Sequence, residues 1–154
     1  MKVFVTGVNG QLGHDVMNEL AKRGYEGVGS DLAPEYAGVA DNTAVTKAPY
    51  VALDITDAEA VDDDKVAAVR KVNVGGTQNI ANVAKKLDVP MVYLSTDYVF
   101  DGQGTKPWEP DFKGYKPLNV YGETKLGGEK AVADILDKYF IVRIAWVFGV
   151  NGSN

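Results

Sequence analysis

The chain has 154 residues, carries a formal charge of −5 and contains no cysteine. This length accommodates one domain of ordinary size with a single packed core. Nucleic acids and anionic membranes are bound through clustered Lys and Arg, so the acidic, scattered charge argues against both partners. Without cysteine there is no disulfide, thiolate nucleophile or Cys-ligated zinc, and no stretch approaches the ~18 apolar residues of a membrane span. We therefore expect a cytoplasmic protein with no metal site.

The first part of the chain alternates strands with a helix. Residues 3–5 are β-branched and aromatic and stop at a glycine-rich turn, which is typical of a buried parallel strand. Apolar residues at helical spacing predict a helix over 11–23, with Gly24 as its C-cap. Two further strands are expected at 27–30 and 50–53, each followed by an aspartate.

The second part continues this alternation. In chain order we expect a long helix over 62–87 interrupted or kinked near Gly75 and Gly76, a strand at 91–94, a loop over 101–116, a helix over 120–137 and another buried strand at 140–146. Strands that alternate with helices predict an α/β fold with a Rossmann-type, doubly wound parallel sheet. We assign residues 1–154 to this one domain.

The first strand is followed by a turn with a G-x-x-G-x-x-G pattern. Glycines permit a tight turn and bring backbone N–H groups against a pyrophosphate, whose charge the N-terminus of the next helix stabilises. The strand before the turn and the helix after it are the context that this pattern requires. The turn therefore predicts a dinucleotide site that contains Gly7, Asn9, Gly10, Gln11, Leu12 and Gly13.

Two aspartates end the next two strands. Asp31 stands at the spacing expected for a carboxylate that accepts hydrogen bonds from an adenosine ribose, and it would repel a 2′-phosphate. This favours NADH over NADPH unless Lys22 or Arg23 compensates, so both cofactors stay open. Asp54 either meets the adenine edge or merely caps the following turn, and the sequence does not separate these two roles.

Three later residues fit one chemistry. Thr96 lies at the carboxyl end of a predicted strand, the edge at which open α/β sheets bind ligands. Tyr121 and Lys125 are four residues apart on a predicted helix, so both lie on one face. A phenol can protonate the alkoxide that forms when hydride attacks a ketone, and a neighbouring ammonium stabilises tyrosinate. We predict Thr96, Tyr121 and Lys125 as catalytic residues, with Tyr121 and Lys125 also contacting the cofactor.

The sequence resembles the extended short-chain dehydrogenase/reductases, and among them the dTDP-4-dehydrorhamnose reductase branch. The segments that carry the resemblance are 6–13, 95–102, 117–125 and 143–149. The resemblance implies NADH- or NADPH-dependent reduction of the 4-keto group of a dTDP-sugar, giving dTDP-L-rhamnose. It also implies that Asn73 supports the site and that Asp97 and Trp146 lie near the sugar, although Trp146 is equally consistent with an ordinary core aromatic on a strand.

The chain departs from that family pattern in two places. Between Val61 and Asp62 the family has the end of a helix, a further buried strand and a loop. Loss of a central strand would leave the backbone groups of its neighbours unpaired, so we expect an omitted segment and a spatial gap between these two residues. The chain also stops where the family's small C-terminal substrate domain begins, so we expect that domain to be missing and the activity of the fragment to be reduced or lost.

Two other functions compete with the reductase. A nucleotide-sugar epimerase uses the same Tyr/Lys pair and retains its NAD through the cycle. A regulatory subunit resembling methionine adenosyltransferase beta is not catalytic and binds a partner enzyme; the intact Thr96, Tyr121 and Lys125 weaken that alternative. Either a monomer or a homodimer is compatible with the sequence.

Overall fold

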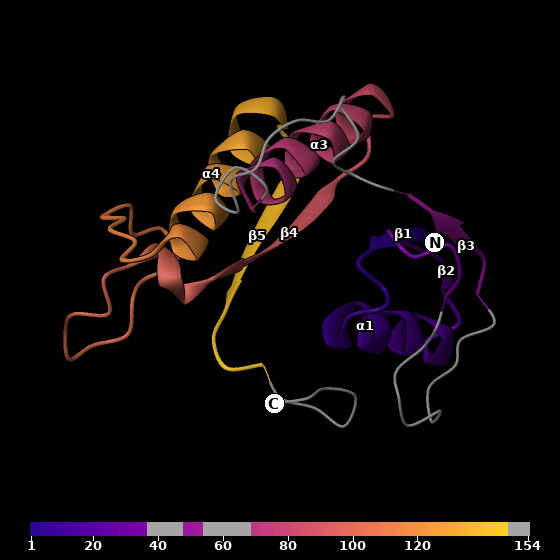
Figure 1. Ribbon diagram of the computed structural model, residues 1–154, viewed down its shortest axis with the longest axis horizontal. Coiled ribbons are helices and arrows are strands. Elements are labelled where there is room, and N and C mark those ends of the chain that lie inside the picture. Colours follow the sequence, from indigo (N-terminus) through magenta and orange to yellow (C-terminus); the bar gives the residue numbers. More distant parts are fainter. Residues whose placement is uncertain (37–47, 54–68, 148–154) are drawn as a thin grey trace. The chain divides into compact units, whose positions relative to one another are not determined.

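The computed structural model describes residues 1–36, 48–53 and 69–147 (Figure 1). The chain forms two compact units, one made of Met1–Asp54 with Trp146–Asn154 and the other of Ile55–Ala145. Helices alternate with strands, and every strand pairing in the described ranges is parallel. The predicted Rossmann-type α/β class is confirmed, whereas the assignment of residues 1–154 to one domain stays a prediction.

The first unit is a parallel sheet with a helix beside it. Its elements are β1 (Lys2–Thr6), α1 (Gln11–Lys22), β2 (Glu26–Asp31) and β3 (Tyr50–Ala52), with the strands in the order β1-β2-β3. The register pairs Thr6 with Ser30, so β1 and β2 end at the same edge of the sheet. The turn between β1 and α1 begins at this edge.

The C-terminus of α1 confirms the predicted glycine cap. Gly24 has a φ of 71°, in the left-handed region that glycine enters without a steric penalty. The Gly24 N–H donates to the Ala21 carbonyl (3.0 Å), and the Tyr25 N–H donates to the Leu20 carbonyl (2.9 Å). These bonds satisfy carbonyls at the helix end and turn the chain into β2.

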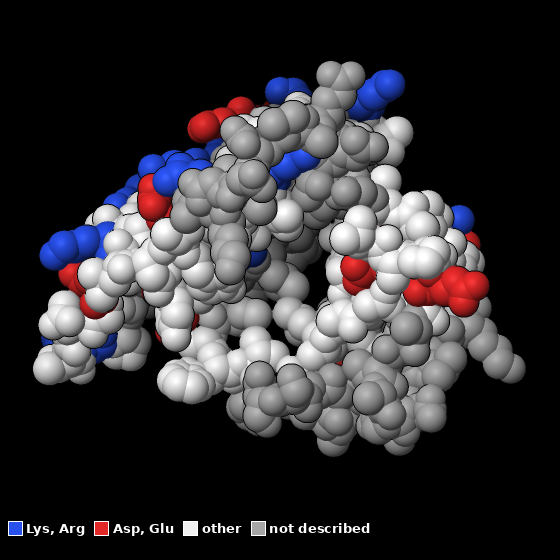
Figure 2. Space-filling view, viewed as in Figure 1, with Lys and Arg blue, Asp and Glu red and all other residues white. Residues whose placement is uncertain are grey.

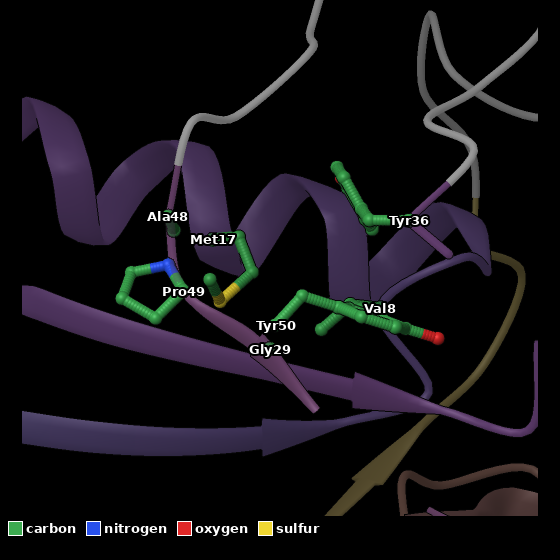
Figure 3. A pocket seen from close by; sticks show the side chains of 7 residues that line it. All are labelled: Val8, Met17, Gly29, Tyr36, Ala48, Pro49 and Tyr50. Carbon is green, nitrogen blue, oxygen red and sulfur yellow. The ribbon is translucent and has the colours of Figure 1, made fainter. Parts of the chain in front are cut away.

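A small apolar pocket lies between α1 and β2 (Figure 3). A Cβ on Gly29 would lie 3.1 Å from a methyl group of Val8, so the absence of a side chain there lets the turn after β1 pack on β2. None of the described residues that line the pocket has a charged side chain, so this lining is a packing feature rather than an anion site. Its lining residues are Val8, Met17, Gly29, Tyr36, Ala48, Pro49 and Tyr50.

The second unit pairs two parallel strands under two helices (Figure 1). Its elements are the π-helical segment η1 (Lys71–Gly76), α3 (Thr77–Lys86), β4 (Met91–Thr96), the 3₁₀ turn η2 (Asp97–Val99), α4 (Val120–Ile135) and β5 (Tyr139–Ile144). The predicted interruption near Gly75 and Gly76 corresponds to the widened π-helical turn, which continues directly into α3. The part of that helix expected over 62–68 lies outside the described residues.

A hydrophobic core joins α3 and α4 to the two strands. Ala81 and Ala84 of α3 and Val132 of α4 pack with Tyr93, and Ile141 of β5 packs against this cluster. The core therefore lies on one face of the β4–β5 sheet. It fixes α4, which carries two of the three predicted catalytic side chains, over the strand that ends at Thr96, the third.

Two expectations about the strands are corrected. The strands at 3–5 and 140–146 were expected to be buried, yet Phe4 is 49% exposed and Phe140 is 65% exposed. For Phe140 the reason is that the described core of the second unit covers only the sheet face that carries Tyr93 and Ile141, while side chains alternate between the faces of a strand. The last strand also ends at Ile144, two residues before Trp146.

The predicted gap between Val61 and Asp62 lies outside the described residues, as does Asp54. Helix α1 and strands β1, β2 and β4 agree with their predicted positions to within two residues at each end. Helix α4 ends at Ile135, two residues earlier than expected.

Candidate functional site

The turn between β1 and α1 is held by backbone hydrogen bonds. The Gly7 N–H donates to the Ser30 carbonyl (2.8 Å), and the Gly10 N–H donates to the Gly7 carbonyl (3.1 Å). Gly7 has a φ of 73°, a conformation that L side chains rarely adopt. The turn thus reverses the chain within a few residues and starts α1 directly above the end of β1 and β2.

Gly10 and Gly13 serve this turn differently. A Cβ on Gly13 would lie 2.2 Å from the Gly7 carbonyl oxygen, so Gly13 is required for α1 to pack against the turn. A Cβ on Gly10 would lie 3.4 Å from the same oxygen, which is ordinary contact. The backbone at Gly10 is therefore open on the side where a ligand would approach.

The N-terminus of α1 fits an anionic group. Gly10 is the N-cap residue and offers no side-chain acceptor to the first helical N–H groups. These groups and the helix dipole favour a phosphate at this position. The Gln11 Nε2 atom is buried and finds no hydrogen-bond partner within the part of the chain that the structure describes. Both observations are consistent with a pyrophosphate bound against the turn.

Asp31 is tied to the same turn. Its Oδ2 atom accepts a hydrogen bond from the Asn9 N–H (2.9 Å), and its Oδ1 atom accepts one from the Leu32 N–H (2.7 Å). A carboxylate has about four acceptor positions, so these two bonds leave capacity for ribose hydroxyls. The structure thus brings the predicted ribose-binding carboxylate to the predicted pyrophosphate turn.

Helix α4 begins at a well-defined cap next to β4. The Asn119 side chain accepts a hydrogen bond from the Gly122 N–H (2.8 Å), which is typical of a helix N-cap. A Cβ on Gly122 would lie 2.1 Å from the Tyr98 carbonyl oxygen, so this glycine lets the first turn of α4 pack on η2. Tyr121 and Lys125 follow on α4 at the spacing that the sequence predicted.

Lys125 lies against the end of β4. Its Nζ atom donates to the Leu94 carbonyl (2.7 Å) and lies 4.3 Å from the centroid of the Tyr93 ring. Burial lowers the pKa of Lys125, and the negative charge of Glu129 on the same helix partly offsets that effect. The ammonium is therefore held by a carbonyl and an aromatic face near the carboxyl end of β4.

Tyr121 and Thr96 have different surroundings. Tyr121 is half exposed and packs edge-on against Tyr98, with ring centroids 6.0 Å apart. Thr96 is only 6% exposed; its hydroxyl donates to Asp97 Oδ1 (3.0 Å) and accepts from the Tyr98 N–H (3.3 Å). Thr96 caps η2, so the turn that holds its hydroxyl also places Tyr98 against Tyr121.

Asn73 reaches the same helix from η1. Its Nδ2 atom donates to Thr124 Oγ1 (3.0 Å), and that hydroxyl donates to the Tyr121 carbonyl (3.0 Å). Asn73 thus steadies the turn of α4 that presents Tyr121. Sequence reasoning missed Thr124, whose only signal is its position between Tyr121 and Lys125.

Trp146 lies beyond the end of β5 and is 88% exposed. Its φ of 51° is unusual for a bulky residue. The alternative that Trp146 is an ordinary core aromatic on a strand is therefore wrong, because the side chain is neither buried nor in the strand. Its assignment to the sugar stays a prediction.

Comparison with known proteins gives the family. The whole chain, residues 1–154, matches the family described as the RmlD substrate binding domain. The chain belongs to this family. A dTDP-4-dehydrorhamnose reductase of Escherichia coli is 33% identical over 164 residues, covering 100% of this chain and 54% of the relative. A Streptomyces griseus protein of the same name is 35% identical, and the match covers 98% of this chain and 51% of that relative.

Solved structures agree with this membership. The crystal structure of a dTDP-4-dehydrorhamnose reductase from Clostridium acetobutylicum has a TM-score of 0.75 and 30% identity, with 99% of this chain and 56% of that chain covered. A reductase of the same name from Bacillus anthracis, crystallised with NADP, has a TM-score of 0.74 and 28% identity, with coverage of 99% and 56%. The RmlD-family chain thus spans about half the length of the relatives it matches.

The described residues contain neither a membrane-spanning helix nor a metal site. None of the helices in 1–36, 48–53 and 69–147 is long and apolar enough to cross a membrane. In the same ranges, no three His, Asp or Glu side chains group into a site for a metal ion.

Proposed function

We propose that this RmlD-family chain carries the cofactor turn and the Tyr/Lys site for NADH- or NADPH-dependent reduction of the 4-keto group of dTDP-4-dehydro-L-rhamnose to dTDP-L-rhamnose. The observation that carries the proposal is the placement of the Lys125 ammonium. It lies 2.7 Å from the Leu94 carbonyl at the end of β4, on the helix that presents Tyr121 one turn earlier.

The cofactor would be held by the first unit. The N-terminus of α1, with the open backbone at Gly10, would bind the pyrophosphate, and Asn9, Gln11 and Leu12 would line the same turn. Asp31 would accept hydrogen bonds from the adenosine ribose, with Asp54 as a further candidate at the adenine. When bound, a reduced nicotinamide supplies a hydride to the substrate carbonyl carbon.

Residues of the second unit would carry out the proton transfer to the substrate oxygen. As the carbonyl oxygen gains negative charge, Tyr121 donates its phenolic proton to it as general acid. Lys125 stabilises the resulting tyrosinate by its positive charge and contacts the nicotinamide ribose. The Thr96 hydroxyl would turn from Asp97 Oδ1 to the substrate oxygen, which frees Asp97 to accept a hydrogen bond from the sugar.

The sugar itself would be bound by residues at the ends of β4 and β5. Asp97 follows β4 directly, and Trp146 follows β5 with its ring exposed. A solvated aromatic ring can stack on the apolar face of a hexose. We propose a dTDP-sugar as the small-molecule partner, and a monomer or homodimer as the assembly.

The two competing functions are less well supported. Several relatives that match this chain at 30% identity or more, among them those of Escherichia coli and Streptomyces griseus, are named as dTDP-4-dehydrorhamnose reductases. The similarity to a solved UDP-galactose 4-epimerase is 24% in identity and concerns the fold alone. For a non-catalytic regulatory subunit, nothing would require Tyr121 and Lys125 to share a helix face at a ligand-binding sheet edge.

The test is an assay of the protein with NADH or NADPH and dTDP-4-dehydro-L-rhamnose, following oxidation of the nicotinamide. Tyr121→Phe keeps the ring and removes the proton, so we expect a rate lower by about 100-fold or more. Tyr98→Phe, which keeps the ring that packs on Tyr121, is the matched control and should stay within a few fold of the wild type. Sugar conversion without net oxidation of the cofactor would instead identify an epimerase. Equal and measurable rates for Tyr121→Phe and wild type would contradict the proposal.

A further inference from the structure

Tyr93 is a buried aromatic side chain that lies under the proposed site. It is 7% exposed, lies in the middle of β4 and belongs to the core cluster under α3 and α4. Its ring face receives the Lys125 ammonium at 4.3 Å from the centroid. A cation at this distance over a phenol ring is attracted by the negative face of the π system.

The position of the Tyr93 ring is itself fixed by α4. A Cβ on Gly128 would lie 2.2 Å from the Tyr93 hydroxyl, so Gly128 leaves the space that the hydroxyl fills. The hydroxyl also points to the Lys125 carbonyl oxygen, at 3.5 Å. Burial raises the pKa of Tyr93 to about 12, so the ring stays neutral at ordinary pH. Tyr93 is thus a rigid, uncharged surface under the lysine.

Glu129, one turn after Lys125, does not hold the ammonium directly. Both of its carboxylate oxygens are bound by the Arg143 guanidinium, at 2.8 Å from Nε and 2.7 Å from Nη2. Glu129 therefore acts on Lys125 only through its charge, which Arg143 balances. Among the described residues, the groups that hold the Lys125 ammonium in place are the Leu94 carbonyl and the Tyr93 ring.

We propose that Tyr93 is a positioning residue for Lys125, and that its ring face and the Leu94 carbonyl form a seat that keeps the ammonium charged and fixed at the carboxyl end of β4. The catalytic consequence of this seat rests on the proposed function. Tyr93 acts through Lys125 and does not itself contact substrate or cofactor.

The test uses the protein with ¹⁵N- and ¹³C-labelled lysine, with the Lys125 signal assigned from its loss in Lys125→Arg. In the wild type, the ring current of Tyr93 should shift the ε-methylene protons of Lys125 upfield of the other lysines. Tyr93→Leu should remove this shift and lower the Lys125 pKa by about one unit, because the charged form loses its cation–π contact. Tyr93→Phe keeps the ring face and should keep both properties.

The matched control is Tyr139→Leu. Tyr139 packs on the same core cluster but pairs with Met91 at the start of β4, three positions before Leu94. The Tyr139→Leu substitution should destabilise the protein without changing the Lys125 signal or the Lys125 pKa. If Tyr93→Leu leaves that signal and pKa at their wild-type values, or if Tyr139→Leu changes them equally, the seat does not exist.

Cofactor titrations then connect the seat to the proposed function. Tyr93→Leu should bind NADH or NADPH about three- to tenfold more weakly at neutral pH, with Tyr93→Phe close to wild type. Affinity that depends on the charged lysine falls as pH rises through the Lys125 pKa, so this fall should begin at lower pH in Tyr93→Leu. If Lys125→Met binds the cofactor as tightly as the wild type, the proposed role of Lys125 fails, while the NMR result still decides whether Tyr93 positions it.

Discussion

At the scale of single residues, Gly10 and Gly13 stand in the same turn and yet have different physical reasons to be glycine. Gly13 has no room for a side chain, because its Cβ would overlap the Gly7 carbonyl oxygen at 2.2 Å. Gly10 has an extended backbone with φ −84° and ψ 158°, which any residue adopts, and its Cβ would meet no atom of the described residues closer than 3.4 Å. Only a ligand would require glycine at Gly10.

This difference predicts opposite behaviour of two alanine variants. Gly13→Ala forces the turn and α1 apart and should lower the free energy of unfolding by about 2 kcal/mol. Gly10→Ala should unfold at the wild-type temperature but bind NADH and NADPH at least tenfold more weakly, since a methyl group then lies where the pyrophosphate approaches. Thermal unfolding followed by circular dichroism, together with cofactor titration, measures both effects. If Gly10→Ala binds the cofactor with wild-type affinity, the pyrophosphate does not bind at this turn.

At the scale of elements, Arg143 of β5 holds the loop between η2 and α4 in place through several contacts. Besides its two bonds to Glu129, Arg143 donates to the Pro110 carbonyl (3.2 Å) and to the Tyr115 hydroxyl (2.9 Å). Its guanidinium also lies 5.2 Å from the ring centroid of Phe100, which stacks on Trp108. One arginine thus connects α4, β5 and an otherwise irregular segment.

We expect removal of the Glu129 carboxylate to be costly. The side chains of Glu129 and Arg143 are 4% and 17% exposed, so Glu129→Ala leaves a largely buried guanidinium without its counter-charge, at a cost of about 3 kcal/mol. The exposed pair of Arg70 and Glu123 is the matched control, and Arg70→Ala should cost less than about 1 kcal/mol. Chemical denaturation gives both values, and equal losses would contradict the special role of the buried pair.

The elements also show where sequence patterns succeed and where they fail. The helix over α1 and its glycine cap at Gly24 were predictable, because helical spacing and capping are local properties of the chain. The burial of β5 was not predictable from the sequence. The apolar stretch around Phe140 has the same composition whether one face of the sheet is covered or both. The bidentate pairing of Glu129 with Arg143 joins residues 14 positions apart and has no local signal.

At the scale of the whole molecule, charge and ligand binding are the measurable properties. On the face shown in Figure 2, acidic and basic side chains are interspersed rather than gathered into a basic patch. The formal charge of −5 gives a field that repels polyanions. A dinucleotide must therefore be bound by local groups such as the turn amides and the N-terminus of α1.

Ligand-linked stability tests this conclusion. A cofactor present at 100 times its dissociation constant stabilises the folded state by about 2.7 kcal/mol, which for a chain of this length raises Tm by about 5 to 10 °C. We expect NADH to give a larger shift than NADPH at equal concentration, because the Asp31 carboxylate repels a 2′-phosphate. Differential scanning fluorimetry measures the shifts, and Asp31→Asn should narrow the difference. A larger shift with NADPH than with NADH in the wild type would show that Asp31 does not select the cofactor.

The sequence by itself determined the α/β class, the glycine turn after β1 and the helix that presents Tyr121 and Lys125, because each depends on residues within a few positions of one another. Only the tertiary structure decided that Gly13 touches Gly7, that Asp31 bonds the turn at Asn9 and that the Lys125 ammonium lies on Tyr93. These contacts depend on which surfaces the packing of helix on sheet brings together. That choice is made by the whole buried core, and no short stretch of sequence encodes it.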